Sequence, residues 1–235
     1  MDKNAVVSAL DRAVSETVSE EFEYITNGKS VSIGQWLRNN SRNDIFQSLR
    51  SLTPPNYSNP MVSVVYAAMY QLQHINMTYS AIKELLVSKN ADKATITNSP
   101  RLQVIDLGAG CLAMQFGLTL AVADSLEQGH QNIAVHVDSM DPNLTMCTLG
   151  EKIWLNFLRI VNQDNSEPSS TLSSLHRACS MVTHRLHKNI QSIDTLDDSE
   201  IWISAIHAFY QVFEKQIRTD LWTNSRCHAT TRSDR

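Results

Sequence analysis

Glycine and proline are scarce in this chain of 235 residues, with 7 glycines and 6 prolines. An all-β sandwich or barrel needs many tight turns, and these two residue types form most of them. Hydrophobic residues make up 42% and charged residues 19% of the chain, which are ordinary values for a globular core. The composition therefore excludes a disordered or fibrous protein and favours a helix-rich fold, with one medium domain or one domain plus a small extension.

Paired cysteine motifs and long apolar runs are also missing. The four cysteines are widely spaced, and no basic segment followed by an apolar core opens the chain, so we expect neither disulfides nor secretion. The longest apolar stretches, near residues 61–70 and 112–123, fall short of the roughly 20 residues of a membrane helix. We expect a cytoplasmic protein without a transmembrane segment.

A basic excess is absent as well. The formal net charge is -4, and the first 25 residues carry all of it, because the rest of the chain has 18 acidic and 18 basic residues. An electrostatic binder of nucleic acid normally has a clear positive excess. The charge balance thus gives no indication of nucleic acid as a partner.

Helical periodicity dominates the first part of the chain. Apolar residues spaced by three and four over residues 4–25, Val7 among them, predict an amphipathic helix with an acidic outer face. Two prolines end a short helix expected over 43–52, and a longer helix is expected from Asn59 to about Ser88, either continuous or broken near Thr78. We predict a helical N-terminal extension over residues 1–92 and a linker at 93–100.

The pattern changes after the linker. Apolar residues at 102–107 stop at Gly108 and are typical of a buried parallel strand, a mostly apolar helix follows over 112–126, and residues 133–137 alternate as a second strand. Strand, glycine-rich turn, helix and strand form the βαβ unit of an α/β fold. The further elements expected are a helix opened by Pro142, a polar loop at 163–171, a helix at 172–190, a third strand at 200–205 and a helix at 209–221.

We predict an α/β domain over residues 101–222, followed by a disordered tail at 223–235. Only 30 residues follow the third expected strand, which is too few for three more strands with their connections. The sheet is therefore expected to be incomplete, and its exposed edge could pair with a second copy of the chain or with a partner strand.

The most informative stretch is VIDLGAGCL at residues 104–112. Glycines at the end of a first strand let the backbone approach a ligand, and the start of the next helix offers unpaired N–H groups. Gly108, Gly110 and Ala113 also satisfy the weaker form of the dinucleotide fingerprint. These residues favour a nucleotide-like ligand over a plain tight turn with Asp106 as a helix cap.

Asp106, Gly108 and Gly110 resemble the first motif of the class I S-adenosylmethionine-dependent methyltransferases, an acid followed by Gly-x-Gly-x-Gly, with Leu112 in place of the third glycine. The resemblance implies a Rossmann-like sheet of the methyltransferase type. It also implies that Asp106 lies near the methionine end of S-adenosylmethionine and that the glycines make room for its backbone and ribose. A carboxylate there suits an ammonium, whereas it would repel a nicotinamide pyrophosphate.

The second motif of that family is an acid that closes the second strand and binds the ribose hydroxyls. Asp141 matches it, and Asp138 is the competing candidate. A carboxylate only accepts hydrogen bonds, so it can receive both ribose hydroxyl protons. We favour Asp141, because it directly precedes Pro142, where the strand must stop.

The leading hypothesis is thus a transferase that binds S-adenosylmethionine and methylates an unknown acceptor with unidentified catalytic residues. One alternative is an inactive or truncated methyltransferase-like module that acts by binding or interaction. Another is an NAD-dependent oxidoreductase, which is disfavoured by Asp106 and by the 33-residue separation of Asp141 from Gly108, against about 20 expected.

Four weaker patterns complete the sequence analysis. The TPPNY segment at 53–57 resembles the polar-Pro-Pro-aromatic motif of amino-methyltransferases in a wrong order, and a helix-stopping turn is the simpler interpretation. His207 is a candidate at the pocket mouth, with a structural histidine as the default. Tyr57, Tyr66 and Tyr70 are either core or a lid over the cofactor. The helix expected over 172–190 contains four potential metal ligands, His176, Cys179, His184 and His187. The first and the last would lie roughly 16 Å apart along the helix, too far for one ion to bind all four, so we expect no metal site.

Overall fold

The structure of the protein is a computed structural model, and it describes residues 2–28, 32, 34–36, 59–91, 101–129, 133–164, 172–188 and 190–205. Several expected elements lie outside these residues: the helices at 43–52 and 209–221, the linker, the tail, Tyr57 and His207.

Two N-terminal helices agree with the periodicity of the sequence. Helix α1 spans Lys3–Ile25, and the Asp2 side chain caps it by accepting a hydrogen bond of 2.9 Å from the backbone N–H of Asn4. Helix α4 spans Pro60–Ala91 without a break at Thr78. The inner stripe of α1 is buried as expected except at Val7, which is 61% exposed, and at Ile25, which is half-buried.

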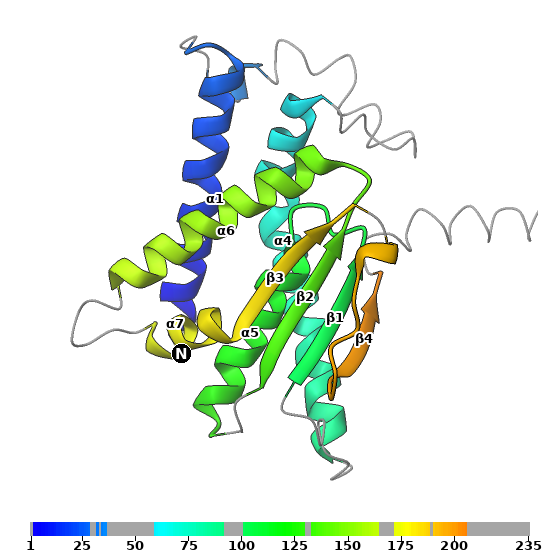
Figure 1. Ribbon diagram of the computed structural model, residues 1–235. Coiled ribbons are helices and arrows are strands. Elements are labelled where there is room, and N and C mark those ends of the chain that lie inside the picture. Colours follow the sequence, from blue (N-terminus) through cyan, green and yellow to red (C-terminus); the bar gives the residue numbers. More distant parts are fainter. Residues whose placement is uncertain are drawn as a thin grey trace, which may run out of the picture.

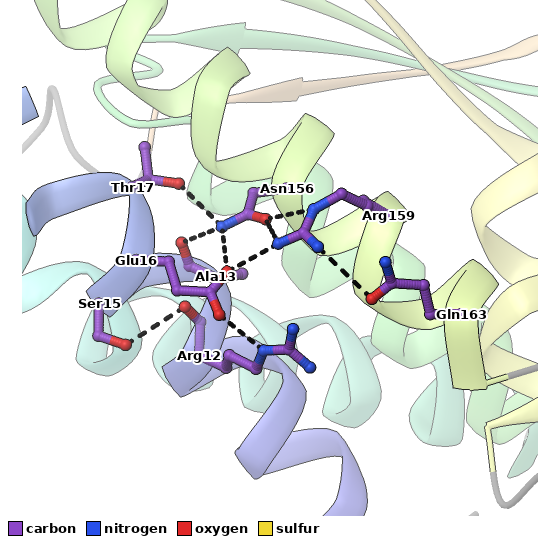
Figure 2. A network of polar contacts seen from close by, with 8 residues as sticks. All are labelled: Arg12, Ala13, Ser15, Glu16, Thr17, Asn156, Arg159 and Gln163. Carbon is purple, nitrogen blue, oxygen red and sulfur yellow. Dashed lines mark hydrogen bonds and ion pairs between the residues drawn. The ribbon is translucent and has the colours of Figure 1, made fainter. Parts of the chain in front are cut away.

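A polar network joins α1 to helix α6, which spans Leu144–Asp164 (Figure 2). The Asn156 side-chain amide donates to the backbone carbonyl of Ala13 at 3.2 Å, and Arg159 donates to the Glu16 carboxylate at 2.8 Å. Glu16 also accepts from Arg12 at 2.7 Å. The acidic face of α1 is thus partly used to hold α6.

Four parallel strands form the sheet in the order β3-β2-β1-β4 (Figure 1). They are β1 (Arg101–Leu107), β2 (Ala134–Met140), β3 (Val182–His187) and β4 (Glu200–Ser204). Helix α5 (Ala113–Glu127) connects β1 to β2, and α6 with α7 (Ser173–Met181) connects β2 to β3. The predicted α/β fold with a parallel sheet and N-terminal helices is confirmed. The described part of the sheet has four strands.

The helix predicted over 172–190 was wrong in its second half. Helix α7 ends at Met181, and the chain enters β3 at Val182 with no loop between them. Val182, His184 and Leu186 alternate with polar residues, so this segment satisfies a strand pattern as well as a helical one. The open edge of β2 decides between them, because β3 pairs with it over six residues.

The two faces of the sheet differ. Val104, Val135 and Val137 lie on one face and are buried, and Figure 1 shows α4 and α5 behind this face. On the other face Ile201 and Ile203 of β4 are 43% and 72% exposed. The β3–β4 connection crosses this second face, where it contains the short helix η1 (Ile190–Ser192).

Two helical glycines allow unusually close packing. A Cβ atom at Gly117 of α5 would lie 2.7 Å from the Thr78 side chain of α4, and one at Gly150 of α6 would lie 2.6 Å from the backbone of Cys111. The residues from Ala113 to Ala123 are all buried, so α5 is surrounded by the sheet and the other helices. No helix among the described residues is long and apolar enough to cross a membrane.

Candidate ligand site at the carboxyl end of the sheet

The motif residues lie where β1 and β2 end side by side. Residues 108–112 form the turn from β1 into α5, which we call the glycine loop. The backbone N–H groups of Gly108 and Ala109 donate to the carbonyl of Met140, the last residue of β2, at 2.8 and 3.0 Å. Ligands of open α/β sheets bind at this end of the strands.

Every second residue of the glycine loop is left-handed. The φ angles are +78° at Gly108, +51° at Gly110 and +63° at Leu112. Leucine is costly in this conformation, by about 1–3 kcal/mol. Its side chain is completely buried, and that burial offsets the cost. The loop therefore adopts at Leu112 the backbone conformation for which a third glycine would be suited.

Side chains from other elements hold the glycine loop in place. Asp141 accepts a hydrogen bond of 2.9 Å from the backbone N–H of Gly110. The buried Gln71 of α4 donates to the carbonyl of Cys111 at 2.8 Å. Gly150 of α6 packs directly against the same residue. Contacts from three other parts of the chain thus fix the position of the loop.

Asp141 follows the last residue of β2 and joins three elements. Its second oxygen accepts from the backbone N–H of Asn143 at 2.7 Å, and the Asn143 side chain in turn caps α6 by accepting from Thr145 at 3.0 Å. Each carboxylate oxygen of Asp141 receives one hydrogen bond from the chain and has a further lone pair. It remains able to accept from a ligand hydroxyl.

Asp106 is the unusual member of the site. Its side chain lies on the helix-covered face of β1 and is fully buried, and neither oxygen has a hydrogen-bond partner among the described residues. Ser139 of β2 and Ser204 of β4 are its register neighbours, and their hydroxyls are likewise without partners there. A row of polar groups therefore crosses three strands in the interior.

Burial raises the pKa of Asp106 to about 7. The Ser204 hydroxyl is the donor nearest to Asp106 and opposes this shift, although no hydrogen bond of normal geometry joins the two side chains, and the negative charge of Asp141 adds to the shift. An ionised buried carboxylate without hydrogen bonds is costly, and a cation beside it would remove much of that cost. The site is thus suited to a positively charged ligand group.

The first turn of α5 offers the complementary charge. Its N-cap is Leu112, which provides no side-chain hydrogen bond, and the first turn contains no acidic residue. The N–H groups at a helix start carry a partial positive charge and bind anions. Asp106 and this helix start together match a ligand that carries an ammonium and a carboxylate.

Asp138 belongs to a different environment. It lies inside β2 on the face opposite Asp106, and it is 3% exposed. One oxygen lies 2.5 Å from Nε2 of His187, and the other accepts from the Gln103 amide at 2.6 Å. Both oxygens of Asp138 therefore already have partners within the protein, which favours Asp141 as the candidate ribose ligand.

Two buried thiols flank the glycine loop. Cys111 lies in it, and Cys147 lies in the first turns of α6. Burial raises the pKa of both thiols, and the negative charge of Asp141 adds to the shift. Both therefore stay protonated and unreactive in the folded protein.

The remaining candidates are spread over the fold. Tyr66, Tyr70 and His74 form a half-buried row on α4, with the Tyr70 and His74 rings stacked at 6.1 Å. His176 and Cys179 lie on α7, whereas His184 and His187 lie on β3. No group of three metal-binding side chains exists in the part of the chain that the structure describes.

Two cavities lie away from the motif. One of about 450 Å³ lies between α1, α4 and α5, and Val7 and Tyr79 are among its lining residues. The other, of about 250 Å³, is lined by residues of α1, α4 and α6, Thr145 among them. Neither is lined by Asp106, Gly110 or Asp141.

Sequence analysis missed Gln71 and Gly150 as supports of the site. A signal for Gly150 exists, since glycine in a helix interior costs about 1 kcal/mol and points to a close approach. Gln71 interrupts an apolar stripe, which predicts a buried partner without saying which one.

Comparison with known proteins gives no further assignment. No protein-family model matches the chain, and neither a curated protein nor a solved structure matches it. The functional argument therefore depends on the site itself.

Proposed function

We propose that the protein binds S-adenosylmethionine at the glycine loop and serves as a methyltransferase for an acceptor that is still to be identified. The observation that carries the proposal is the buried carboxyl group of Asp106, without hydrogen-bond partners among the described residues, at the end of β1. It is the kind of group that an ammonium ligand would complete.

The residues present fit this cofactor at both ends. Asp106 and the first turn of α5 would hold the ammonium and the carboxylate of its methionine part. Asp141 would accept hydrogen bonds from the ribose hydroxyls. S-adenosylmethionine supplies an electrophilic methyl group when bound, and the chain would supply position and orientation.

A nicotinamide dinucleotide fits less well. Its pyrophosphate carries two negative charges and would have to lie at the strand ends near Asp106 and Asp141. A protein that binds S-adenosylmethionine without methyl transfer remains the second candidate, because the described residues of the site include no side chain in position to act as a base beyond these acids and the raised-pKa thiols.

Calorimetric titration tests the proposal directly. We expect the purified full chain to bind S-adenosylmethionine, or its demethylated product S-adenosylhomocysteine, and to show no heat with NAD. Gly108→Val should abolish the binding, since a side chain there would enter cofactor space and strain a left-handed turn. Tight NAD binding without a response to S-adenosylmethionine would reverse the assignment.

The two acids at β2 provide a second test. Asp141→Ala should weaken binding of S-adenosylmethionine by about 1.5 to 3 kcal/mol, because hydrogen bonds to a charged group are lost. Asp138→Ala should leave the affinity nearly unchanged while lowering the melting temperature, because it breaks the bonds to His187 and Gln103. Titration and thermal unfolding of both variants separate the two effects. The opposite order of affinities would make Asp138 the ribose ligand.

A further inference from the structure

A chain of polar contacts lies on the second face of the sheet, which is the face opposite Asp106. Nε2 of His187 lies 2.5 Å from the Asp138 carboxylate, and Nδ1 of His187 lies 3.1 Å from the hydroxyl of Ser192. His187 ends β3, Asp138 belongs to β2, and Ser192 ends η1. The strand assignment of β3 is what brings these three residues together.

The hydrogen bonds determine which nitrogen of His187 carries the proton. The Asp138 carboxylate can only accept, so Nε2 of His187 donates to it. In the neutral imidazole, Nδ1 then has its lone pair directed at the Ser192 hydroxyl, which donates. This is the protonation state in which an imidazole removes a proton from a serine.

Other residues hold the carboxylate still. The Gln103 amide donates to the second oxygen of Asp138 at 2.6 Å, and it is fixed in turn by the carbonyl of Asp194 at 2.8 Å. Nε2 of a second imidazole, His136, lies 3.2 Å from Asp138. The acid is therefore oriented from two further directions.

Burial is graded along this chain of contacts. The side chains of Asp138 and His187 are each 4% exposed, whereas Ser192 is exposed to solvent. A base oriented by a buried acid and bonded to an accessible hydroxyl is the general signature of an activated nucleophile.

We propose that Ser192, His187 and Asp138 form a nucleophilic site, separate from the glycine loop, that reacts with acyl esters. Ser192 Oγ forms a bond to the acyl carbon, its proton moves to Nδ1 of His187, and the ester C–O bond breaks. The leaving alcohol takes that proton. Water then adds to the acyl carbon with the same base and releases the carboxylic acid and the free serine. Asp138 keeps its negative charge throughout and stabilises the imidazolium.

A fluorophosphonate probe tests the nucleophile, because it reacts with activated serines by forming a P–O bond and releasing fluoride. We expect one label per full-length chain, located at Ser192 by peptide mass spectrometry. His187→Gln should lower the labelling rate constant by about 100-fold or more, the usual contribution of a general base. Asp138→Asn should lower it as well.

Ser180, which is exposed, and Ser199, which is half-buried, serve as controls, because among the described residues the hydroxyl of each donates to a backbone carbonyl at 2.7 Å and not to an imidazole. Their alanine variants should label like the wild type, whereas Ser192→Ala should not label. Circular dichroism identifies any variant that fails to fold. Labelling of Ser192 no faster than of Ser199, or unchanged in a folded His187→Gln, would overturn the proposal.

Discussion

Replacing Asp106 by asparagine is expected to stabilise the ligand-free protein at pH 8 by about 2 to 4 kcal/mol and to weaken binding of S-adenosylmethionine by about 100-fold. The substitution keeps the shape of the side chain and removes its charge. Chemical denaturation at pH 8 measures the first effect, and calorimetric titration measures the second.

The stability gain follows from the sign of the pKa shift. Burial raises the pKa of Asp106 to about 7 in the folded protein, whereas the pKa of an aspartate in the unfolded chain is about 4. Between these values the folded state binds more protons, so the free energy of unfolding of the wild type falls as the pH rises from about 4 to about 7. Asp106→Asn should remove this part of the pH dependence.

The same group makes ligand binding depend on pH. An ammonium ligand needs the ionised carboxylate, so the affinity for S-adenosylmethionine should rise as the pH increases through 7, up to the pH at which the ligand's own ammonium loses its proton. Asp138→Asn is the matched control, because its carboxylate accepts from Gln103 and His187 and its neutralisation should destabilise the fold. A destabilised Asp106→Asn would show that this carboxylate has a partner in solution.

The second large effect is expected at Gly150. An added Cβ would lie 2.6 to 2.8 Å from backbone atoms of Cys111, which cannot rotate away as a side chain can. We expect Gly150→Ala to lower the free energy of unfolding by about 2 kcal/mol, the result of an overpacking cost of about 3 and a helix-propensity gain of about 1. It should also weaken binding of S-adenosylmethionine, because the clash moves the glycine loop.

Gly117→Ala separates stability from binding. Its Cβ would meet the Thr78 side chain at 2.7 Å and the backbone N of Tyr79 at 2.9 Å, so the fold should be destabilised to a similar degree. The contact lies between α4 and α5 rather than at the glycine loop. Equal affinity loss in both glycine variants would mean that binding follows global stability and not loop position.

The elements that the sequence predicted well are those with a single strong local signal. The apolar run before Gly108 became β1, and the periodic residues after Asn143 became α6, with Met146, Ile153 and Phe157 buried as expected. Both segments have a pattern that fits one period and a clear boundary residue. Local signals were sufficient there.

The segment from Val182 to His187 had two compatible patterns, and no local signal separates them. Its strand state depends on pairing with β2, a contact between residues nearly fifty positions apart. The same nonlocal contact places His187 beside Asp138. Sequence periodicity could therefore not reveal the polar chain on the second face.

The glycine loop was foreseen in its residue types but not in its supports. Gly108 and Gly110 occupy left-handed positions, and Asp141 follows the end of β2. The bond from Gln71 depends on how α4 packs against the rest of the fold, which no spacing within residues 101–160 encodes. The motif predicts the residues of the loop, whereas the residues that support it depend on tertiary packing.

The alkylation rates of the buried thiols can report how often the structure around each of them opens. Thiolates alkylate and protonated thiols do not, so Cys111 and Cys147 become reactive only when the structure around them opens. Cys179 on α7 is similarly suppressed by burial but lies outside the site. Alkylation of Cys111 ahead of Cys179 would reveal local opening of the glycine loop, and alkylation of both at one rate would mean that the loop opens only when the whole fold does.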